Sequence, residues 1–179
     1  MRYPVRQVAP ADLPMLFAYL GEQLTENGRN GMPLFQPIPR TEDPVVPAAM
    51  RERFTRGLAT PVGEPGWRRA WIAVDPQGGI AGHIDLRANA DEACGHRTQL
   101  GMGVHRDCRR LGLGSLLIDT VIAWAGATGF AWIDLEVLSA NAPAIGLYLR
   151  KGFLRAGEFD DMYRLDNERH GCTFMTYRL

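Results

Sequence analysis

TQLGMGVHRDCRRLGLGS, residues 98–115, is the stretch that predicts the fold: a strand, a turn rich in arginine and glycine, and the start of a helix. Its first half alternates apolar residues with small or polar ones, which is the period of a strand with one buried face. Apolar residues from Leu113 onward recur at helical spacing until Gly129, which is placed to end the helix. Gly101 and Gly103 inside the strand indicate a bulge or a close approach by backbone or ligand.

The turn after this strand has the features of an anion site. Gly112 and Gly114 fall at the predicted helix start, where free backbone N–H groups and the positive end of the helix dipole attract negative charge. Their missing side chains would let a phosphate approach, and Arg109 and Arg110 add fixed positive charge. Because glycines before a helix are common, an ordinary turn is the alternative on this feature alone.

Two motifs in order carry a resemblance to a known family. Arg109-x-x-Gly112-x-Gly114 after a strand resembles the acetyl-CoA signature of the GCN5-related N-acetyltransferases, the GNAT superfamily. LEVLSANAPAIGLYLRKGF, residues 135–153, follows where that family places its next strand and helix. The resemblance covers residues 99–153 and is closest in motif to bacterial ribosomal-protein N-terminal acetyltransferases and their relatives.

The fold class that the resemblance implies is α/β. The expected GNAT fold has a mixed, mostly antiparallel, twisted sheet with helices on both faces and a splayed central pair of parallel strands. The chain has 179 residues, of which 46% are hydrophobic and 22% charged, and this is ordinary usage for one globular domain with an adequate core. We therefore expect a single acetyltransferase domain over residues 1–179.

The resemblance further implies acetyl-CoA as co-substrate and no metal. In the family the pantetheine arm lies between the splayed strands, and the bare Gly101 and Gly103 would leave a backbone N–H open to polarise the thioester oxygen. A simple bulge is the alternative. The residues carried over as acetyl-CoA contacts are Met102, Gly103, Val104, Arg109, Arg110, Leu111, Gly112, Leu113, Gly114, Ser115, Asn141, Tyr148 and Lys151.

Tyr148 is the candidate acid. It lies where the family's tyrosine commonly protonates the departing sulfur or hydrogen-bonds to it. A phenol suits this role because it stays protonated at neutral pH and can donate to a developing anion. Without the motif, a helical tyrosine beside Leu147 would be read as a packing residue.

Glu136 is the first candidate for the general base. A strand over residues 131–138 would place it on the same face as Trp132 and Asp134, beside the splay, where we expect partial desolvation. Such a carboxylate could take the amine's proton through a bridging water. A structural pair with an arginine is the alternative, and Asp134 and Asp85 are lesser candidates for the base.

One set of side chains suggests a metal instead. Cys94-x-His96 and His105-x-x-Cys108 form a two-plus-two set of potential zinc ligands. The resemblance argues against this site, since it puts the second pair in the phosphate loop and the first at a strand entrance.

The remaining segments are read from periodicity and turn residues. We expect a helix capped by Asp12 and a proline-rich loop over residues 25–47, which is either functional or partly disordered. Met32 and Phe35 in this loop would touch a substrate or pin the loop to the body. The other expected elements are a helix over 48–58, a hairpin of 67–74 and 80–88, a helix over 142–151 capped by Asn141, and a closing pair of 153–165 and 172–179 around the connection 167–171.

Charge and cysteine content limit the partners. Twenty basic and 20 acidic residues give a formal net charge of zero, so no overall field draws the chain to nucleic acid or to an anionic membrane. The acidic residues Glu158, Asp160 and Asp161 would favour a cationic acceptor or form a solvated face. Three cysteines and a start without an apolar core predict a cytoplasmic protein. A homodimer is left open.

The expected activity is N-acetylation of a primary amine by direct transfer from acetyl-CoA. The acceptor, a small-molecule amine or a protein N-terminus, is left open. The alternative is a catalytically inactive acyl-CoA-binding sensor or scaffold. A nucleotide-binding domain is more distant, because no Walker-type lysine follows the glycines: Ser115 and Leu116 come after Gly114.

Overall fold

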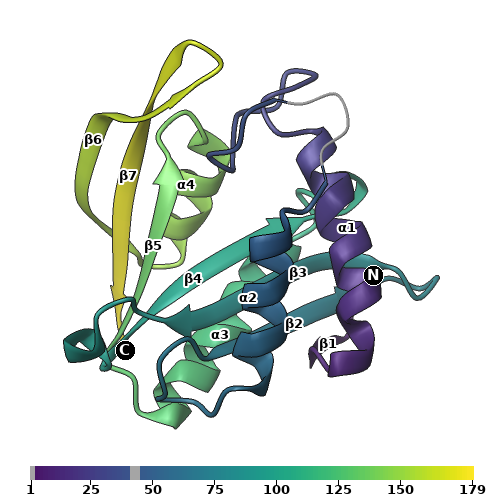
Figure 1. Cartoon of the computed structure of the whole chain (residues 1–179), viewed down its shortest axis with the longest axis vertical. Helices are drawn as coiled ribbons and strands as arrows, with labels where there is room; N and C mark the ends of the chain where they lie inside the picture. The colour runs from purple at the N-terminus through teal and green to yellow at the C-terminus, as the bar shows by residue number, and fades with distance from the viewer. Residues whose placement is uncertain (1–2, 41–44) are drawn as a thin grey trace.

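Seven strands form one twisted sheet in a computed structural model that describes residues 3–40 and 45–179 (Figure 1). The order across the sheet is β1-β2-β3-β4-β5-β7-β6. The strands are β1 (Val5–Gln7), β2 (Arg68–Val74), β3 (Ile80–Ala88), β4 (Arg97–Val104), β5 (Trp132–Leu138), β6 (Leu154–Leu165) and β7 (Glu168–Arg178). The helices are α1 (Leu13–Thr25), α2 (Ala48–Ala59), α3 (Leu113–Thr128) and α4 (Ala142–Arg150).

The sheet is mixed and mostly antiparallel. β4 and β5 pair in parallel, and the other neighbouring pairs among the described strands are antiparallel. α3 is the crossover that joins the two parallel strands, as such a pair requires. The predicted fold class, with its central parallel pair, is confirmed.

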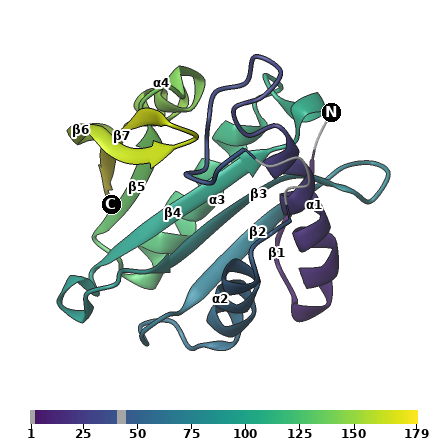
Figure 2. The same ribbon diagram turned by 45° about the horizontal axis from the view of Figure 1, so that its top comes forward.

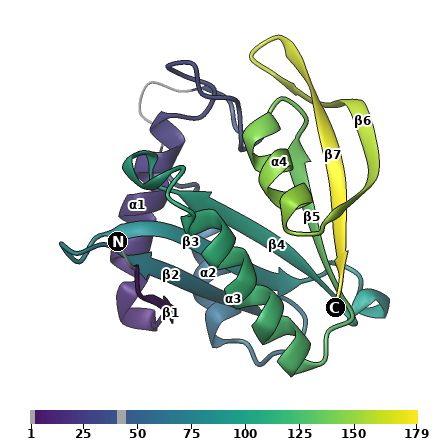
Figure 3. The ribbon, with the colours of Figure 1, turned by 180° about the vertical axis from the view of Figure 1, so that it is seen from behind.

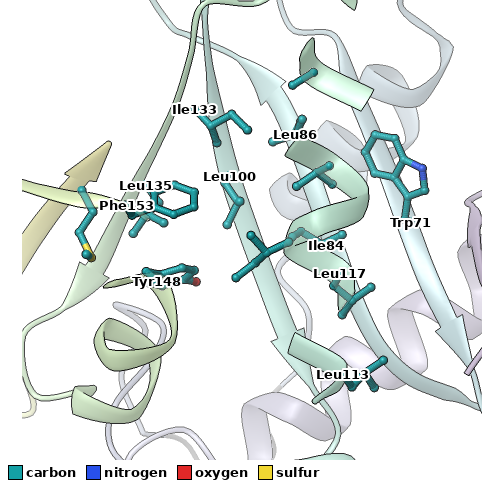
Figure 4. Packing of buried hydrophobic residues seen from close by; sticks show 14 of the residues in the cluster. Trp71, Ile84, Leu86, Leu100, Leu113, Leu117, Ile133, Leu135, Tyr148 and Phe153 are labelled. Atoms are coloured by element: carbon teal, nitrogen blue, oxygen red, sulfur yellow. The ribbon is translucent and has the colours of Figure 1, made fainter. Parts of the chain in front are cut away.

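Helices cover both faces of the sheet. α1 and α2 lie on the face that Figure 1 shows, which we call the front face, and α3 and α4 lie on the back face (Figures 1 and 3). On the back face, Leu117 of α3 lies over Ile84 of β3 (Figure 4), and Val121 and Leu86 belong to the same buried cluster. These four side chains are completely buried, so the apolar periodicity of α3 is explained by core packing.

Several helix boundaries agree with the sequence. α3 ends at Gly129, whose φ of 91° gives the left-handed cap expected there. α4 begins after Asn141, whose side chain accepts a hydrogen bond from the backbone N–H of Ala144 at 3.3 Å. α2 ends one residue beyond the predicted Leu58. None of the helices within the described residues is long and apolar enough to cross a membrane.

Contrary to the prediction, the Asp12 side chain makes no capping hydrogen bond to α1. Its side chain accepts a hydrogen bond from the backbone N–H of Ala9 at 2.8 Å and forms an ion pair with Arg6 at 2.6 Å. These contacts turn it back toward a short 3-10 helix, Pro10–Asp12, that precedes α1. The two partners lower the pKa of Asp12 to about 2.

The closing hairpin turns earlier than predicted. The sequence placed its connection over residues 167–171, but β7 already begins at Glu168. Asp166 and Asn167 form the turn with φ of 52° and 63°. Two consecutive residues of positive φ make the tight turn that matches strand twist, and Asp and Asn tolerate that conformation.

Within the proline-rich loop, residues 26–40 are held by hydrogen bonds and by an ion pair. The buried Asn27 side chain accepts hydrogen bonds from the backbone N–H groups of Phe35 and Gln36, at 2.8 and 2.9 Å. It also donates to the carbonyl oxygen of Gln36 at 2.9 Å. Farther along, Arg40 pairs with Asp166 at the tip of the closing hairpin. The loop therefore links the end of α1 to the β6–β7 hairpin (Figure 2), and residues 41–44 lie outside the described part.

Candidate active site

β4 and β5 pair over a short length and then separate. Their ladder joins Arg97 to Trp132, Thr98 to Ile133 and Gln99 to Asp134, and it stops there. Beyond that point β4 remains paired with β3, and β5 remains paired with β7. Figure 1 shows the two strands diverging upward from their paired ends. The splay expected of the central parallel pair is therefore present.

The backbone of β4 is open toward the splay. His105 N–H donates to Ala81 O at 2.9 Å, which fixes the side of β4 that bonds to β3. Because peptide groups alternate in direction along a strand, those of Met102 and Val104 point the other way, into the gap. Of the Val104 groups that face the gap, the carbonyl oxygen accepts a hydrogen bond from Arg109 Nε at 3.1 Å. The N–H groups of Met102 and Val104 also face the gap.

Of the causes predicted for the strand glycines, a bulge is contradicted, and a close approach by a ligand stays a prediction. The ladder between β3 and β4 shows no register shift, so the glycines mark no bulge toward β3. A Cβ on Gly101 would lie 2.7 Å from Asp85 Oδ2, and one on Gly103 would lie 3.0 Å from His83 Cε1. The missing side chains therefore make room for two β3 side chains on the front face.

The start of α3 presents free backbone donors. Leu116 N–H donates to Gly112 O at 3.2 Å and is the first amide of this helix with such a partner. Within the described residues, no acceptor is found for the N–H groups of residues 110–115. Gly112 and Arg110 have φ of 79° and 62°, which turns the chain sharply before the helix. This is the geometry in which helix amides bind an anion.

Gly114 is also required by packing. A Cβ on it would lie 2.8 Å from Leu147 Cδ2 of α4 and 3.5 Å from Met102 Cε. The glycine therefore allows α3, α4 and β4 to approach closely. A larger residue at this position would disturb α4 as well as any bound phosphate.

The three cationic candidates differ in their surroundings. Arg109 forms an ion pair with Glu26 at 2.7 Å, and Lys151 forms one with Asp119 of α3. Arg110 is exposed, and no partner for its side chain is found among the described residues. Of the three, Arg110 is the side chain free to meet a ligand.

Tyr148 lies on the inner face of α4. It is buried, with 6% of its surface exposed, and its ring lies 5.6 Å from that of Phe153. Figure 4 shows the ring below Leu135, with its hydroxyl on the side toward β4. Burial raises the pKa of this hydroxyl, so it remains protonated throughout the neutral range.

Glu136 was expected to be partly desolvated, and the structure contradicts this. It lies on the front face of β5, where no helix covers the sheet, and its side chain is exposed (Figure 1). Tyr163 of β6 donates a hydrogen bond to Glu136 Oε2 at 3.4 Å. An exposed carboxylate beside the splay can still exchange protons with a neighbouring amine or water.

Asp134 is engaged in a structural pair. Arg97 donates to both of its carboxylate oxygens at 2.6 Å, and Thr176 donates to Oδ1 at 2.6 Å. A bidentate pair of this kind, together with the threonine hydroxyl, occupies the lone pairs of the carboxylate.

Asp85 is also engaged in ion pairs. It is buried, with 3% of its surface exposed, and pairs with Arg68 at 2.9 Å and with Arg87 at 3.5 Å. Neither this carboxylate nor that of Asp134 is as accessible to an incoming amine as that of Glu136.

Replacing Asp85 with alanine should lower the free energy of unfolding by about 3 kcal/mol, because the buried Arg68 would lose its counter-ion. The matched control is Glu52→Ala, which removes an exposed ion pair with Arg56 and should cost less than about 1 kcal/mol. Urea unfolding of both variants measures the difference. Equal small losses would mean that the Arg68–Asp85 pair contributes little to stability.

The cysteine and histidine pairs do not meet. Cys94 and His96 precede β4, while His105 and Cys108 follow it. At about 3.3 Å per residue, the eight-residue strand holds them more than about 20 Å apart. In residues 3–40 and 45–179, no group of three or more histidine, cysteine or acidic side chains could hold a metal ion.

A sequence model described as the acetyltransferase (GNAT) family matches residues 40–153, which is more than half of the chain. The chain belongs to the GNAT acetyltransferase family. A mycothiol acetyltransferase of Clavibacter michiganensis is 36% identical to this GNAT chain over 115 residues, or 63% of the chain. Those residues span only 36% of that relative's length.

Solved GNAT structures share the fold. A GNAT acetyltransferase of Streptococcus pneumoniae aligns with a TM-score of 0.81 and 22% identity over 99% of this chain and 100% of its own. A phosphinothricin acetyltransferase of Sinorhizobium meliloti, in complex with AcCoA, aligns with a TM-score of 0.80 and 20% identity over 100% of this chain and 89% of its own. A ribosomal-protein-alanine N-acetyltransferase of Brucella melitensis aligns with a TM-score of 0.77 and 19% identity over 98% of this chain and 99% of its own.

Sequence reasoning missed two side chains near the splay of this GNAT chain. Glu26, buried at the end of α1, holds Arg109, and Tyr163 contacts Glu136. Both contacts depend on tertiary placement, and no local pattern marks them. The predicted acidic cluster is partly neutralised, since Asp161 pairs with Arg164 at 2.8 Å.

Proposed function

We propose that this chain is an N-acetyltransferase that moves an acetyl group from acetyl-CoA to a primary amine by direct transfer. The observation that carries the proposal is the splay itself. The open N–H groups of Met102 and Val104 lead from it to the free amides of residues 110–115, with Tyr148 on the opposite side. This combination would offer backbone donors to a thioester arm and an anion site at its end.

In this proposal acetyl-CoA lies in the gap with its pyrophosphate on the start of α3. The amides of residues 110–115 and the free side chain of Arg110 would bind the phosphates. The ion pairs of Arg109 and Lys151 suggest that these two side chains support the turn and α4 rather than reach the ligand. Asn141 contributes by fixing the start of α4, which carries Tyr148.

The chemistry has three requirements, and each has a candidate group. The neutral amine attacks the thioester carbon while a backbone N–H of Met102 or Val104 stabilises the negative charge that develops on oxygen. Collapse breaks the C–S bond, and the Tyr148 hydroxyl donates to the departing thiolate. Glu136 accepts the proton that the amine nitrogen loses, directly or through water. No covalent enzyme intermediate is involved.

Thiol release from acetyl-CoA across a panel of amines tests the activity. The panel should contain amino acids, polyamines, aminoglycosides and short peptides with free N-termini. We expect release that depends on one class of amine, together with stoichiometric acetylated product by mass spectrometry. Tight binding of acetyl-CoA without release from any amine would favour the acyl-CoA sensor instead.

Arg110→Glu should weaken acetyl-CoA binding by about 10-fold or more, because it replaces one charge-assisted phosphate contact with repulsion. The loss should shrink as salt rises, since the side chain is exposed. Arg155→Glu on β6 makes the same charge change away from the turn and is the control. Calorimetry of both variants with acetyl-CoA measures the effect, and equal affinities would remove Arg110 from the phosphate site.

A further inference from the structure

Side chains on the front face of β3, β4 and β5 form two rows that cross the splay. The first row is set by register: Arg87 lies beside Gln99, and Gln99 beside Asp134. In the second row Asp85 lies beside Gly101. On β5 this row continues with Glu136, which is two residues after Asp134 and therefore on the same face. No helix covers this part of the sheet in Figure 1. An amine that approaches the open backbone from the front must therefore pass these two rows.

Arg87 reaches over the bare Gly101. A Cβ on Gly101 would lie 3.1 Å from Arg87 Nη1, so the guanidinium occupies the space that a side chain on β4 would fill. The Arg87 side chain is 37% exposed, and its ion pair with Asp85 is long, at 3.5 Å. Its other nitrogens have no acceptor among the described residues. The fork of donors that a guanidinium offers to a carboxylate is therefore largely free.

The local charge at this point is positive. Asp85 is shared between two guanidinium groups, and its shorter contact, 2.9 Å, is with Arg68. One carboxylate against two guanidinium groups leaves one net positive charge, and the exposed member of the set is Arg87.

The opposite side of the splay is negative. Glu136 is exposed and has no cationic partner among the described residues, and it accepts a hydrogen bond from the Tyr163 hydroxyl. Its neighbour Asp134 is neutralised by Arg97. Adjacent strands lie about 4.8 Å apart, and more where they splay. A cation with free donors thus lies over Gly101 of β4, and an anion without a cationic partner among the described residues lies on the same face of the neighbouring strand β5.

We propose that the acceptor is a small zwitterionic amine of the amino-acid type, whose carboxylate binds Arg87 while its nitrogen lies toward Glu136. This inference rests on the proposed function and names the substrate class of the same site. A guanidinium pairs with a carboxylate through two parallel hydrogen bonds, so Arg87 would fix the acceptor's orientation as well as attract it. Polycationic amines would meet repulsion from Arg87.

The test compares free L-amino acids with their own carboxamides as acceptors. The parent should prefer the acid of a matched pair by about 10-fold or more in kcat/KM, the scale of one charge-assisted pair. The amine of the amide is less basic and is more often neutral, so this bias works against the expected preference.

Arg87→Gln should abolish most of the preference through a higher KM for the acid, with KM for the amide little changed. Arg87→Lys should restore part of it, because the charge returns without the planar fork. Arg155→Gln is the control for loss of an arginine elsewhere on the surface.

Three outcomes would overturn the inference while leaving the acetyltransferase intact. The parent could acetylate acids and amides equally well, or Arg87→Gln could slow both by the same factor, which would indicate a structural role. Turnover confined to peptides with an acidic second residue would point to a protein N-terminus instead. Absence of thiol release with every amine would contradict the proposed function itself, and the inference would fall with it.

Discussion

Tyr148→Phe is expected to slow acetyl transfer by about 10²-fold or more while leaving acetyl-CoA affinity nearly unchanged. The reason is that the hydroxyl, and not the ring, would assist the departing thiolate. Phenylalanine keeps the buried ring against Phe153 and removes only the donor. Burial raises the pKa of this hydroxyl, so the parent should show no loss of the acid form across the neutral range.

Tyr177→Phe is the matched control for this experiment. Tyr177 also packs against Phe153, with ring centroids 5.2 Å apart, and it lies on β7, which does not pair with β4. Single-turnover rates should therefore separate the two variants. If Tyr148→Phe reacts as fast as the parent when chemistry limits the rate, Tyr148 is a packing residue.

Glu136→Gln should lower the rate by about 10²-fold near neutral pH and recover partly at higher pH. The amide keeps the shape of the side chain but cannot take a proton, and an ammonium has no lone pair with which to attack. At higher pH more of the amine arrives already deprotonated, so less depends on the base. Because Glu136 is exposed, the substitution should leave the free energy of unfolding almost unchanged.

The control for Glu136 is Glu158→Gln, an exposed glutamate on β6. The pH–rate profiles of both variants and the parent should be measured on the same amine. Overlapping profiles for Glu136→Gln and the parent would remove Glu136 from the mechanism. The base would then have to be Asp85, freed from its arginines, or a chain of waters.

The strand, turn and helix of residues 98–115 could be predicted because each is set by local sequence. Alternating apolar residues define β4, and Gly129 ends α3 where its φ requires a glycine. The cap at Asn141 is local in the same way. Asp12 shows the limit of such reasoning. Aspartate is a common helix cap, but here its side chain pairs with Arg6 and accepts a hydrogen bond from the backbone N–H of Ala9.

The candidate site was less predictable because its side chains meet through tertiary register. The sequence predicts bare backbone at Gly101 and Gly103, but it does not predict that these positions also make room for side chains of β3. The exposure of Glu136 could not be inferred from its place in a central strand, since it depends on which part of the front face the helices leave open. The ion pair of Arg109 with Glu26 joins residues 83 positions apart.

Hydrogen exchange with and without acetyl-CoA tests the proposed binding site, because it reports on the backbone amides that would bind the ligand. We predict that acetyl-CoA slows exchange of Met102, Val104 and residues 110–115, whose N–H groups face the splay or lie at the start of α3. ATP and NAD at the same concentration should slow exchange at most over 110–115, where a pyrophosphate alone could bind. Protection by acetyl-CoA that spares both Met102 and Val104 would contradict the placement of its thioester arm in the splay.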